Sequence, residues 1–271
     1  MVLSILLILI CVFPVFFLCW NSFKTNEEYN LSKFSPPNSL TTFATNIKDL
    51  MEIGILRSIT NSIIVVIIGV FLSAIFTSMA GFTFSKLKFP GKNFIFWGVI
   101  GCLAIPAQIL IIPLYVFYSK LGITDNLFSL AIFYSIWSFA WGTYLMTSFY
   151  RGIPDELLAS ARIDGANNFQ IYLKIMIPLG KPGIIAVSVI NFFWFWNELF
   201  ISFILNRTNE SKLITPFIAL YGEQGALNFS GSPNWPLIFT ASLLSLVIPI
   251  IIYIVFQNNL VEGLTVGAVK G

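Results

Sequence analysis

The chain has 271 residues, enough for about two soluble domains, but 57% of them are hydrophobic and only 10% are charged, which argues against a soluble fold. The charges sum to +3 and are clustered, so long stretches carry none. The chain has no histidine, which excludes His-dependent catalytic triads and His-ligated metal sites. It also has no G-x-x-x-x-G-K-S/T phosphate loop, so ATP-driven work would require a partner protein.

Several runs with no charge, or with only one, are long enough for the roughly 20 apolar residues of a membrane-spanning helix. These runs are apolar on all sides, as lipid-facing helices are. A large buried helical core is the alternative, but it would leave little polar surface to cover it. We therefore predict an all-α membrane protein in which residues 1–271 form a single transmembrane domain. The six helices are expected at about 1–20, 58–84, 94–118, 126–150, 182–205 and 236–256.

The first run could instead be a signal peptide, but it lacks a positively charged start and an A-x-A-like cleavage site. We interpret it as the first span. Cys11, Cys19 and Cys102 all lie in predicted spans and lack the spacing of metal ligands or of a disulfide framework. We expect them to be packing residues.

Six spans place both termini on one face, together with the connections at 85–92 and 151–181. Lysines crowd into the first of these connections, and dense Lys and Arg near the ends of spans indicate the cytoplasmic side. We therefore expect this face, with both termini, in the cytoplasm. The external loops, 21–57 and 206–235, contain segments rich in Gly, Pro, Ser and Asn that predict turns and surface loops. They could dock an external partner or simply connect spans.

The third predicted span contains Pro106 and Pro113 in the stretch "AIPAQILIIPLY". Proline inside a helix removes a backbone hydrogen bond, so a kink is expected. The kink could serve gating or could be a static feature of the shape.

A polar segment, "ELLASARIDGANNFQIYLKIMIPL", separates the fourth and fifth predicted spans. Pro154 suits a first helical turn, and the acidic residues after it favour the positive end of the helix dipole. Asp164 and Gly165 form a strong turn signal that should end this helix.

A second helix is expected after the turn, capped by Asn167 or Asn168. Pro178 and Pro182 should interrupt it before the fifth span. The result would be a helix, a turn and a helix at the cytoplasmic surface. Lipid-surface helices are usually richer in basic residues than this one, which has only Arg162 between acidic ends. The pattern therefore favours docking into a protein groove.

The segment resembles the cytoplasmic EAA motif of binding-protein-dependent ABC importer permeases, E-A-A-x3-G-x9-I-x-L-P. Its surroundings, "IPDELLASARIDGANNF", are similar to the carbohydrate-uptake branch, which includes the second membrane subunit of maltose-type transporters. Further similarities occur in the same order along the chain: "FPVFFLCWNSFKT", "NSIIVVIIG", "KLKFPGK", "IPAQILIIPLY", "WNELF" and "VEGLTVGAVKG".

The resemblance implies a type I ABC importer permease fold in a bacterial or archaeal inner membrane, surrounded by membrane lipid. Such a chain pairs with a second permease, rests on two ATPase subunits that hold ATP and Mg2+, and receives sugar from an extracytoplasmic binding protein. It binds no cofactor itself, and no nucleic acid partner is expected. The EAA element, residues 153–178, would be the coupling helix seated in a cleft of the ATPase. The residues expected to serve this coupling are Glu156, Ala159, Ser160, Ala161, Asp164, Gly165, Ile175 and Pro178.

One position departs from the family pattern, because Ala159 stands where the motif has a glutamate. The charge-assisted contact often made to the ATPase cannot come from this position. Glu156, one turn earlier, could substitute, or the partner could differ correspondingly.

Glu198, in the stretch "FFWFWNELF", is the only charge inside a predicted span, and such residues are functional candidates. In a helix starting near Pro182 it would lie about 24 Å along the span. With Trp194 and Asn197 it is a candidate for the translocation path. A hydrogen bond within the bundle is favoured over a substrate contact, and snorkelling is a further alternative. Trp194 and Trp196 could stack on sugar rings, but interfacial aromatic residues are the more ordinary interpretation.

The leading hypothesis is therefore a non-enzymatic permease subunit of an ATP-driven sugar importer, with an oligosaccharide as the expected substrate. An ion-coupled secondary transporter is the alternative, supported only by Glu198 and the kinked third span. Such carriers often show internal repeats, and no clear repeat is present. A membrane scaffold without transport would explain the composition but not the surface helix pair.

Overall fold

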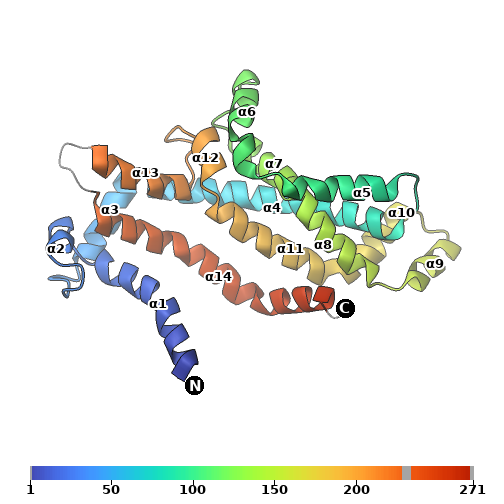
Figure 1. The fold of residues 1–271 in the computed structure, drawn as a ribbon, viewed down its shortest axis with the longest axis horizontal. Helices are drawn as coiled ribbons and strands as arrows, with labels where there is room; N and C mark the ends of the chain where they lie inside the picture. Colours follow the sequence, from blue (N-terminus) through green and yellow to red (C-terminus); the bar gives the residue numbers. More distant parts are fainter. Residues whose placement is uncertain (1, 228–232, 269–271) are drawn as a thin grey trace. The chain divides into compact units, whose positions relative to one another are not determined.

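The computed structural model describes residues 2–227 and 233–268, which form helices and connections and contain no strand. In chain order the helices are α1 (Val2–Ser22), α2 (Asn26–Leu31), α3 (Thr42–Glu52), α4 (Ile55–Lys86), α5 (Lys92–Gly101), α6 (Ala107–Lys120), α7 (Leu127–Trp137), α8 (Phe139–Arg151), α9 (Asp155–Ile163), α10 (Asn168–Ile171), α11 (Ile177–Asn197), α12 (Phe200–Leu205), α13 (Ile214–Leu227) and α14 (Trp235–Ala268) (Figure 1). A 3-10 turn, Cys102–Ala104, follows α5, and a π-helical turn, Tyr172–Met176, joins α10 to α11.

The chain forms two compact units. The first comprises Met1–Ser62 and Arg207–Ile251, and the second comprises Ile63–Asn206 and Ile252–Gly271. Helices α4 and α14 each begin in the first unit and end in the second.

The first unit contains much of the predicted external loops, and these are more helical than expected. Helices α2 and α3 lie within 21–57, and α13 lies within 206–235. Thr25 and Glu28 begin α2 with a reciprocal capping box, which satisfies two otherwise free backbone donors. The buried Lys24 donates from Nζ to the carbonyl oxygens of Ser32 and Lys33, at 3.1 and 3.0 Å. The segment 33–39 is non-helical, as predicted, and part of the second loop, 228–232, lies outside the described residues.

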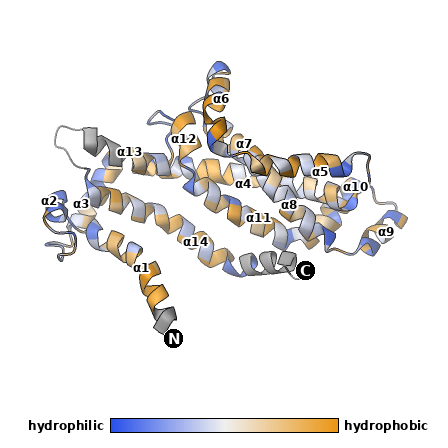
Figure 2. Ribbon diagram, in the orientation of Figure 1, coloured by the Kyte–Doolittle hydropathy of each residue, from blue (hydrophilic) through white to orange (hydrophobic). Residues whose placement is uncertain are grey.

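The long helices have the composition of membrane spans (Figure 2). Among the described residues, three helices are long and apolar enough to cross a membrane: Ile55–Lys86, Asn168–Asn197 and Trp235–Asn259. A bent pair, Lys92–Ala104 and Gln108–Lys120, would add a fourth. Leu6–Ser22 and Leu127–Trp137 are apolar but shorter. The apolar, all-helical architecture agrees with the prediction, while the count of six spans stays a prediction.

Three of the predicted spans are not continuous helices. The pair in 94–118 bends by 100°. Ile105 is extended, because the helical conformation is disfavoured for a residue that precedes a proline. Pro106 lies just before α6. Pro113 stays within α6. The predicted span 126–150 is divided at Ser138, and the span 182–205 is divided at Glu198 and Leu199.

The expected interruption at Pro178 and Pro182 was wrong, since Asn168–Asn197 is a single apolar helix. Ile177 donates its N–H to the carbonyl of Tyr172, five residues back, which is the hydrogen bond of a π-helical turn. Pro178 follows directly in the first turn of α11, so the π-helical turn lies immediately before its ring. Pro182 lies inside α11, and neighbouring helices in a bundle can satisfy the carbonyl that it frees.

Helices α4, α8 and α11 pack closely in the second unit. A Cβ on Gly81 of α4 would lie 2.5 Å from Cβ of Met146, and one on Gly180 of α11 would overlap the ring of Tyr150. Larger residues would separate these helices. The close packing places the end of α8, where the polar segment begins, firmly against α4 and α11.

Candidate functional site: the coupling element

The polar segment 153–178, hereafter the coupling element, begins with α9 at the end of the second unit (Figure 1). Asp155 and Glu156 lie in the first turn of α9, as predicted. Asp155 also accepts a hydrogen bond from Nζ of Lys86, the last residue of α4, at 2.6 Å. This hydrogen bond lowers the pKa of the Asp155 carboxyl, so the contact between the two groups is charged at neutral pH. Lys86 donates to the carbonyl of Ile153 as well, which ties α4 to the start of α9.

The turn after α9 is a Schellman motif. Gly165 has a φ of 83° and donates to the carbonyl of Arg162 at 3.1 Å, while Ala166 donates to the carbonyl of Ala161 at 2.9 Å. This pair of bonds, with a left-handed glycine after the helix, satisfies carbonyls that the helix end leaves free. The predicted turn at Gly165 is therefore confirmed.

Asn167, the first of the two predicted caps, begins the second helix. Its side chain accepts from the N–H of Gln170 at 2.9 Å, and the side chain of Gln170 accepts from the N–H of Asn167 at 2.9 Å. This is a capping box with Asn and Gln in the two positions. Together the Schellman motif and the capping box set the path between α9 and α10 by local hydrogen bonds.

One face of α9 packs within the chain. Leu158 and Ala161 are 2% and 9% exposed. They belong to a hydrophobic cluster whose other buried members come from α4, α8, α10, α11 and the connections between them: Phe82, Met146, Tyr150, Ile153, Ile171, Tyr172, Met176 and Val187. Ala161 was expected at a partner contact, but its side chain is used inside the chain. The α9 helix is thus attached directly to the bundle.

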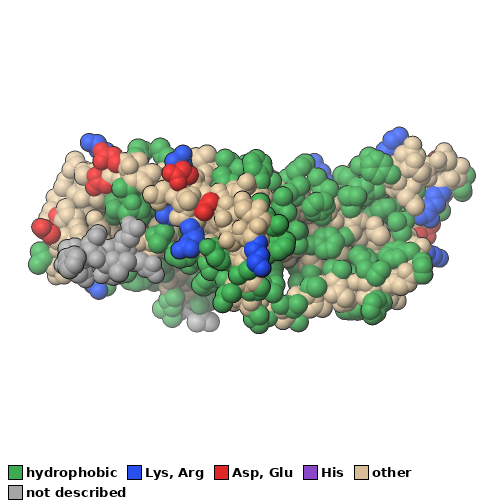
Figure 3. Space-filling model, turned by 90° about the horizontal axis from the view of Figure 1, so that it is seen from above, with side chains coloured by type: hydrophobic (Ala, Val, Ile, Leu, Met, Phe, Trp, Pro, Cys, Tyr) green, Lys and Arg blue, Asp and Glu red, His purple; other side chains and the backbone are tan. Residues whose placement is uncertain are grey.

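The opposite face of α9 and the turn are exposed. Of the residues expected to serve coupling, five lie on this exposed surface: Glu156, Ala159, Ser160, Asp164 and Gly165. Figure 3 shows charged side chains gathered at the end of the second unit where α9 lies. Of the two later motif positions, Ile175 is partly buried against the hydrophobic cluster, and Pro178 is exposed on α11.

Two exposed apolar side chains beside the turn were missed by sequence reasoning. Ile163 is 86% exposed and Phe169 is 62% exposed. They flank the Schellman turn, Ile163 at the end of α9 and Phe169 in α10. For Ile163, its offset along α9 from the buried positions Leu158 and Ala161 was a signal that the sequence contained. Exposed apolar residues at a rigid turn form a surface suited to docking a partner.

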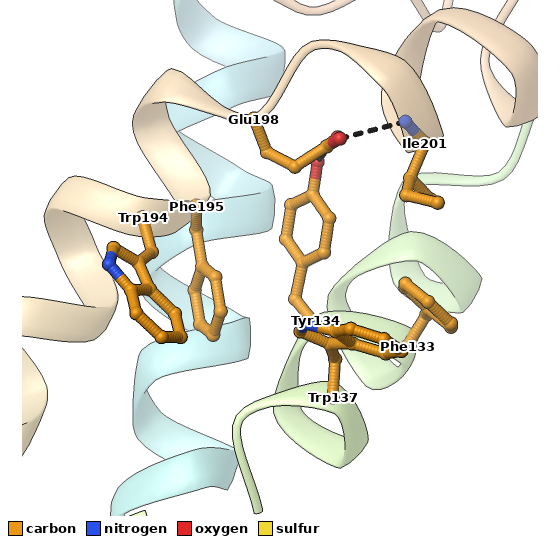
Figure 4. A pocket seen from close by; sticks show the side chains of 7 residues that line it. All are labelled: Phe133, Tyr134, Trp137, Trp194, Phe195, Glu198 and Ile201. Carbon is orange, nitrogen blue, oxygen red and sulfur yellow. Dashed lines mark hydrogen bonds between the residues drawn. The ribbon is translucent and has the colours of Figure 1, made fainter. Parts of the chain in front are cut away.

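The sequence predicts Glu198 inside the fifth span, but in the structure it lies at the break between α11 and α12 (Figure 4). Its Oε1 accepts from the N–H of Ile201 at 2.8 Å, and its Oε2 accepts from the N–H of Ser202 at 2.9 Å. The hydroxyl of Tyr134, in α7, donates to Oε2 at 2.8 Å. The carboxylate therefore caps α12 and joins it to α7, in agreement with the favoured structural role.

The three path candidates are only partly brought together. Trp194 and Glu198 line a pocket of about 170 Å3, with Phe133, Tyr134, Trp137, Phe195 and Ile201 (Figure 4). Asn197 does not line it, and its Nδ2 donates to the carbonyl of Phe193 at 2.8 Å. Trp196 is 3% exposed, so its ring is not available for stacking on a ligand. Within the part of the chain that the structure describes, no group of three His, Cys, Asp or Glu residues is placed to hold a metal ion.

The apolar helices, with an exposed polar element between two of them, are those of a membrane protein of the permease class. Residues 73–264 match the model of the family described as "Binding-protein-dependent transport system inner membrane component". The chain belongs to this family and is a multi-pass membrane protein.

Relatives and a solved structure agree with the family. The putative ABC transporter permease protein ORF2 of Caldicellulosiruptor sp. is 33% identical, over 97% of this chain and 93% of the relative. The arabinooligosaccharides transport system permease protein AraQ of Halalkalibacterium halodurans is 30% identical, over 97% of this chain and 92% of the relative. In fold, the chain is similar to a bacterial ABC transporter involved in the import of the acidic polysaccharide alginate, with a TM-score of 0.80, 23% identity, and coverage of 95% and 93% of the two chains.

Proposed function

We propose that the chain is a permease subunit of an ATP-driven importer for oligosaccharides. The support is its similarity to AraQ, whose name assigns it to arabinooligosaccharide transport, over 97% of this chain. The trehalose transport system permease protein SugB of Mycobacterium tuberculosis is also 30% identical. In this assignment the chain spans the membrane six times, keeps both termini in the cytoplasm, and forms the translocation path with a second permease.

The observation that carries the proposal is the form of α9. Its inner face is fixed to the bundle by Leu158 and Ala161, while its outer face and the following turn are exposed. A helix built in this way transmits force, because a push on the exposed face moves the helices to which the inner face is attached. The partner that delivers the push is one of two ATPase subunits, which bind ATP and Mg2+.

Within the coupling element the residues divide into two groups. Ala159, Ser160 and Ile163 present small and apolar surface to the ATPase cleft, and Glu156 supplies the acidic contact that Ala159 cannot. Ile175 and Pro178 lie in and after the π-helical turn and position the element rather than contact the partner.

Sugar reaches the external face from an extracytoplasmic binding protein. Binding of the loaded protein and closure of the ATPases then change the access of the path from one side of the membrane to the other. ATP hydrolysis is carried out entirely by the partners, and the present chain has no phosphate loop of its own.

Purification of the tagged chain with its native partners tests the proposal. Reconstituted in proteoliposomes, the complex should take up a saccharide only with ATP and loaded binding protein, and vanadate should block uptake. A panel of sugar-loaded binding proteins should identify the one that stimulates ATP hydrolysis. Uptake that persists without any ATPase subunit but collapses with the ion gradient would show that the chain is a secondary transporter.

A further inference from the structure

We propose that Trp137, Trp194 and Glu198 form a saccharide-binding subsite on this chain. The inference rests on the proposed function and adds to it a place where the transported sugar makes direct contact. The three residues come from α7, from α11 and from the break after α11. They lie close together only because the chain folds these elements against one another (Figure 4).

The space beside Glu198 continues into a second pocket. The pocket of about 170 Å3 at Glu198 shares Phe133, Trp137 and Trp194 with a second pocket of about 610 Å3. The two pockets therefore adjoin, and small-molecule sites typically enclose about 300–1,000 Å3. The larger pocket lies beside two breaks, the one between α5 and α6 and the one between α7 and α8. Its remaining lining is apolar: Val99, Cys102, Leu103, Ile105, Pro106, Leu110, Ile136, Phe139, Ala140 and Trp141.

The indole rings of Trp137 and Trp194 are held by neighbouring rings. Trp194 is 50% exposed and packs against Trp141, with ring centroids 5.3 Å apart. Trp141 is itself held by a hydrogen bond from its Nε1 to Oδ1 of Asn191 at 3.0 Å. Trp137 stacks on Phe133, with centroids 6.0 Å apart. Rings held in this way offer fixed apolar faces at a small entropic cost, which suits the C–H faces of a pyranose ring.

Polar groups at the pocket are open to a ligand. Among the described residues, the indole N–H groups of Trp137 and Trp194 meet no hydrogen-bond acceptor, whereas that of Trp141 does. An ionised carboxylate has about four acceptor positions, and three of those on Glu198 are taken, by Tyr134, Ile201 and Ser202. Two donors and one acceptor position remain for a ligand.

A sugar hydroxyl both donates and accepts, so it can use these groups together with the ring faces. A lipid acyl chain could fill the apolar pocket, but it would leave the two indole donors and the one open acceptor position of Glu198 without partners, which costs free energy. The polar groups thus favour a saccharide as the occupant. Tyr134 and the backbone of α12 act as positioning groups, because they hold the carboxylate toward the pocket.

The test uses the whole complex in proteoliposomes with the binding protein and sugar that stimulate its ATPase. Trp194→Ala removes the stacking face, and Trp194→Phe and Trp137→Phe keep a ring but remove the N–H donor. Trp97→Ala is the matched control, since Trp97 is 65% exposed on α5 and lines neither pocket. Uptake per ATP hydrolysed and the ranking of saccharides of different length are measured.

Trp194→Ala should lower uptake per ATP about 2- to 10-fold, as expected for the loss of one stacked ring. The two phenylalanine variants should change the ranking of saccharides, while Trp97→Ala should match the unaltered complex. If Trp194→Ala does not assemble, the phenylalanine variants decide the question, because they preserve the ring packing.

Uptake and saccharide ranking equal to those of Trp97→Ala in every variant that assembles would overturn the subsite. So would a phospholipid that co-purifies with the unaltered complex and is lost from Trp194→Ala without a change in transport. In both cases the unaltered complex still imports sugar, so the proposed function stands. If the unaltered complex imports no saccharide, the proposed function itself fails.

Discussion

Replacing Gly165 with valine should disconnect the coupling element from its partner without disturbing the membrane helices. Gly165 has a φ of 83°, and a Cβ added there would meet nothing within 4 Å. The cost of the substitution is therefore conformational rather than steric. A left-handed backbone costs an ordinary L-residue about 1–2 kcal/mol, and a β-branched residue lies at or above the upper end.

A cost of about 2 kcal/mol corresponds to a roughly 30-fold smaller population of the native turn. The hydrogen bonds that depend on this turn are those from Gly165 to Arg162 and from Ala166 to Ala161. Because their loss frees the last turn of α9, the exposed residue Ile163 would no longer be held in one position. Force from the ATPase would then reach the bundle less efficiently.

The assay is the ratio of sugar imported to ATP hydrolysed in proteoliposomes. Gly165→Val should reduce this ratio several-fold or cause loss of the ATPase subunits on purification. Gly165→Asn is the matched control, since asparagine adopts the left-handed region more readily, and it should retain most of the activity. Normal coupling in Gly165→Val, or equal losses in both variants, would refute the conformational argument.

Other substitutions test the inner and outer faces of α9, the cap at Glu198 and the contact between Asp155 and Lys86. Leu158→Ala should destabilise the packing of α9 by about 2–4 kcal/mol, seen as a lower melting temperature of the purified complex, because the side chain is 2% exposed. Ile163→Ser should leave that melting temperature unchanged but weaken retention of the ATPase, since the residue is 86% exposed. Glu198→Ala should cost about 0.5–2 kcal/mol through loss of the cap on α12, measured by thermal unfolding, and Glu198→Gln should cost less. Lys86 lowers the pKa of Asp155, so their contact is lost only as the pH falls through that lowered pKa. The ratio of sugar imported to ATP hydrolysed should therefore stay constant from about pH 6 to 8, and Asp155→Asn should not introduce a pH dependence in this range.

The coupling element could be predicted in detail because its determinants are local. A glycine after a helix favours a left-handed turn, and Asn followed three residues later by Gln favours a capping box. Both are formed, at Gly165 and at Asn167. The sequence did not indicate how Pro178 would be accommodated, because the π-helical turn before it depends on packing against the neighbouring helices.

The membrane helices were predicted in composition but not in continuity. Apolar runs of sufficient length are visible in the sequence, yet the breaks at Ser138 and Glu198 are not marked by glycine or proline. At Ser138 the side chain bonds Ser73 of α4 at 2.7 Å, and Ser73 in turn accepts from Asn191 of α11 at 2.7 Å. Such a break is stabilised by residues far away in the chain, so no local pattern predicts it.

By itself, the sequence determined the class of the protein, the position of its polar coupling element and the turn at Gly165, because hydropathy and helix capping act over a few residues. Only the tertiary structure decided that Ala161 faces inward while Ile163 faces outward, that Glu198 caps α12 and binds Tyr134, and that Trp137 and Trp194 line one hollow. These outcomes depend on which elements meet in space: Tyr134 and Glu198 are 64 residues apart in the sequence, and Trp137 and Trp194 are 57 residues apart.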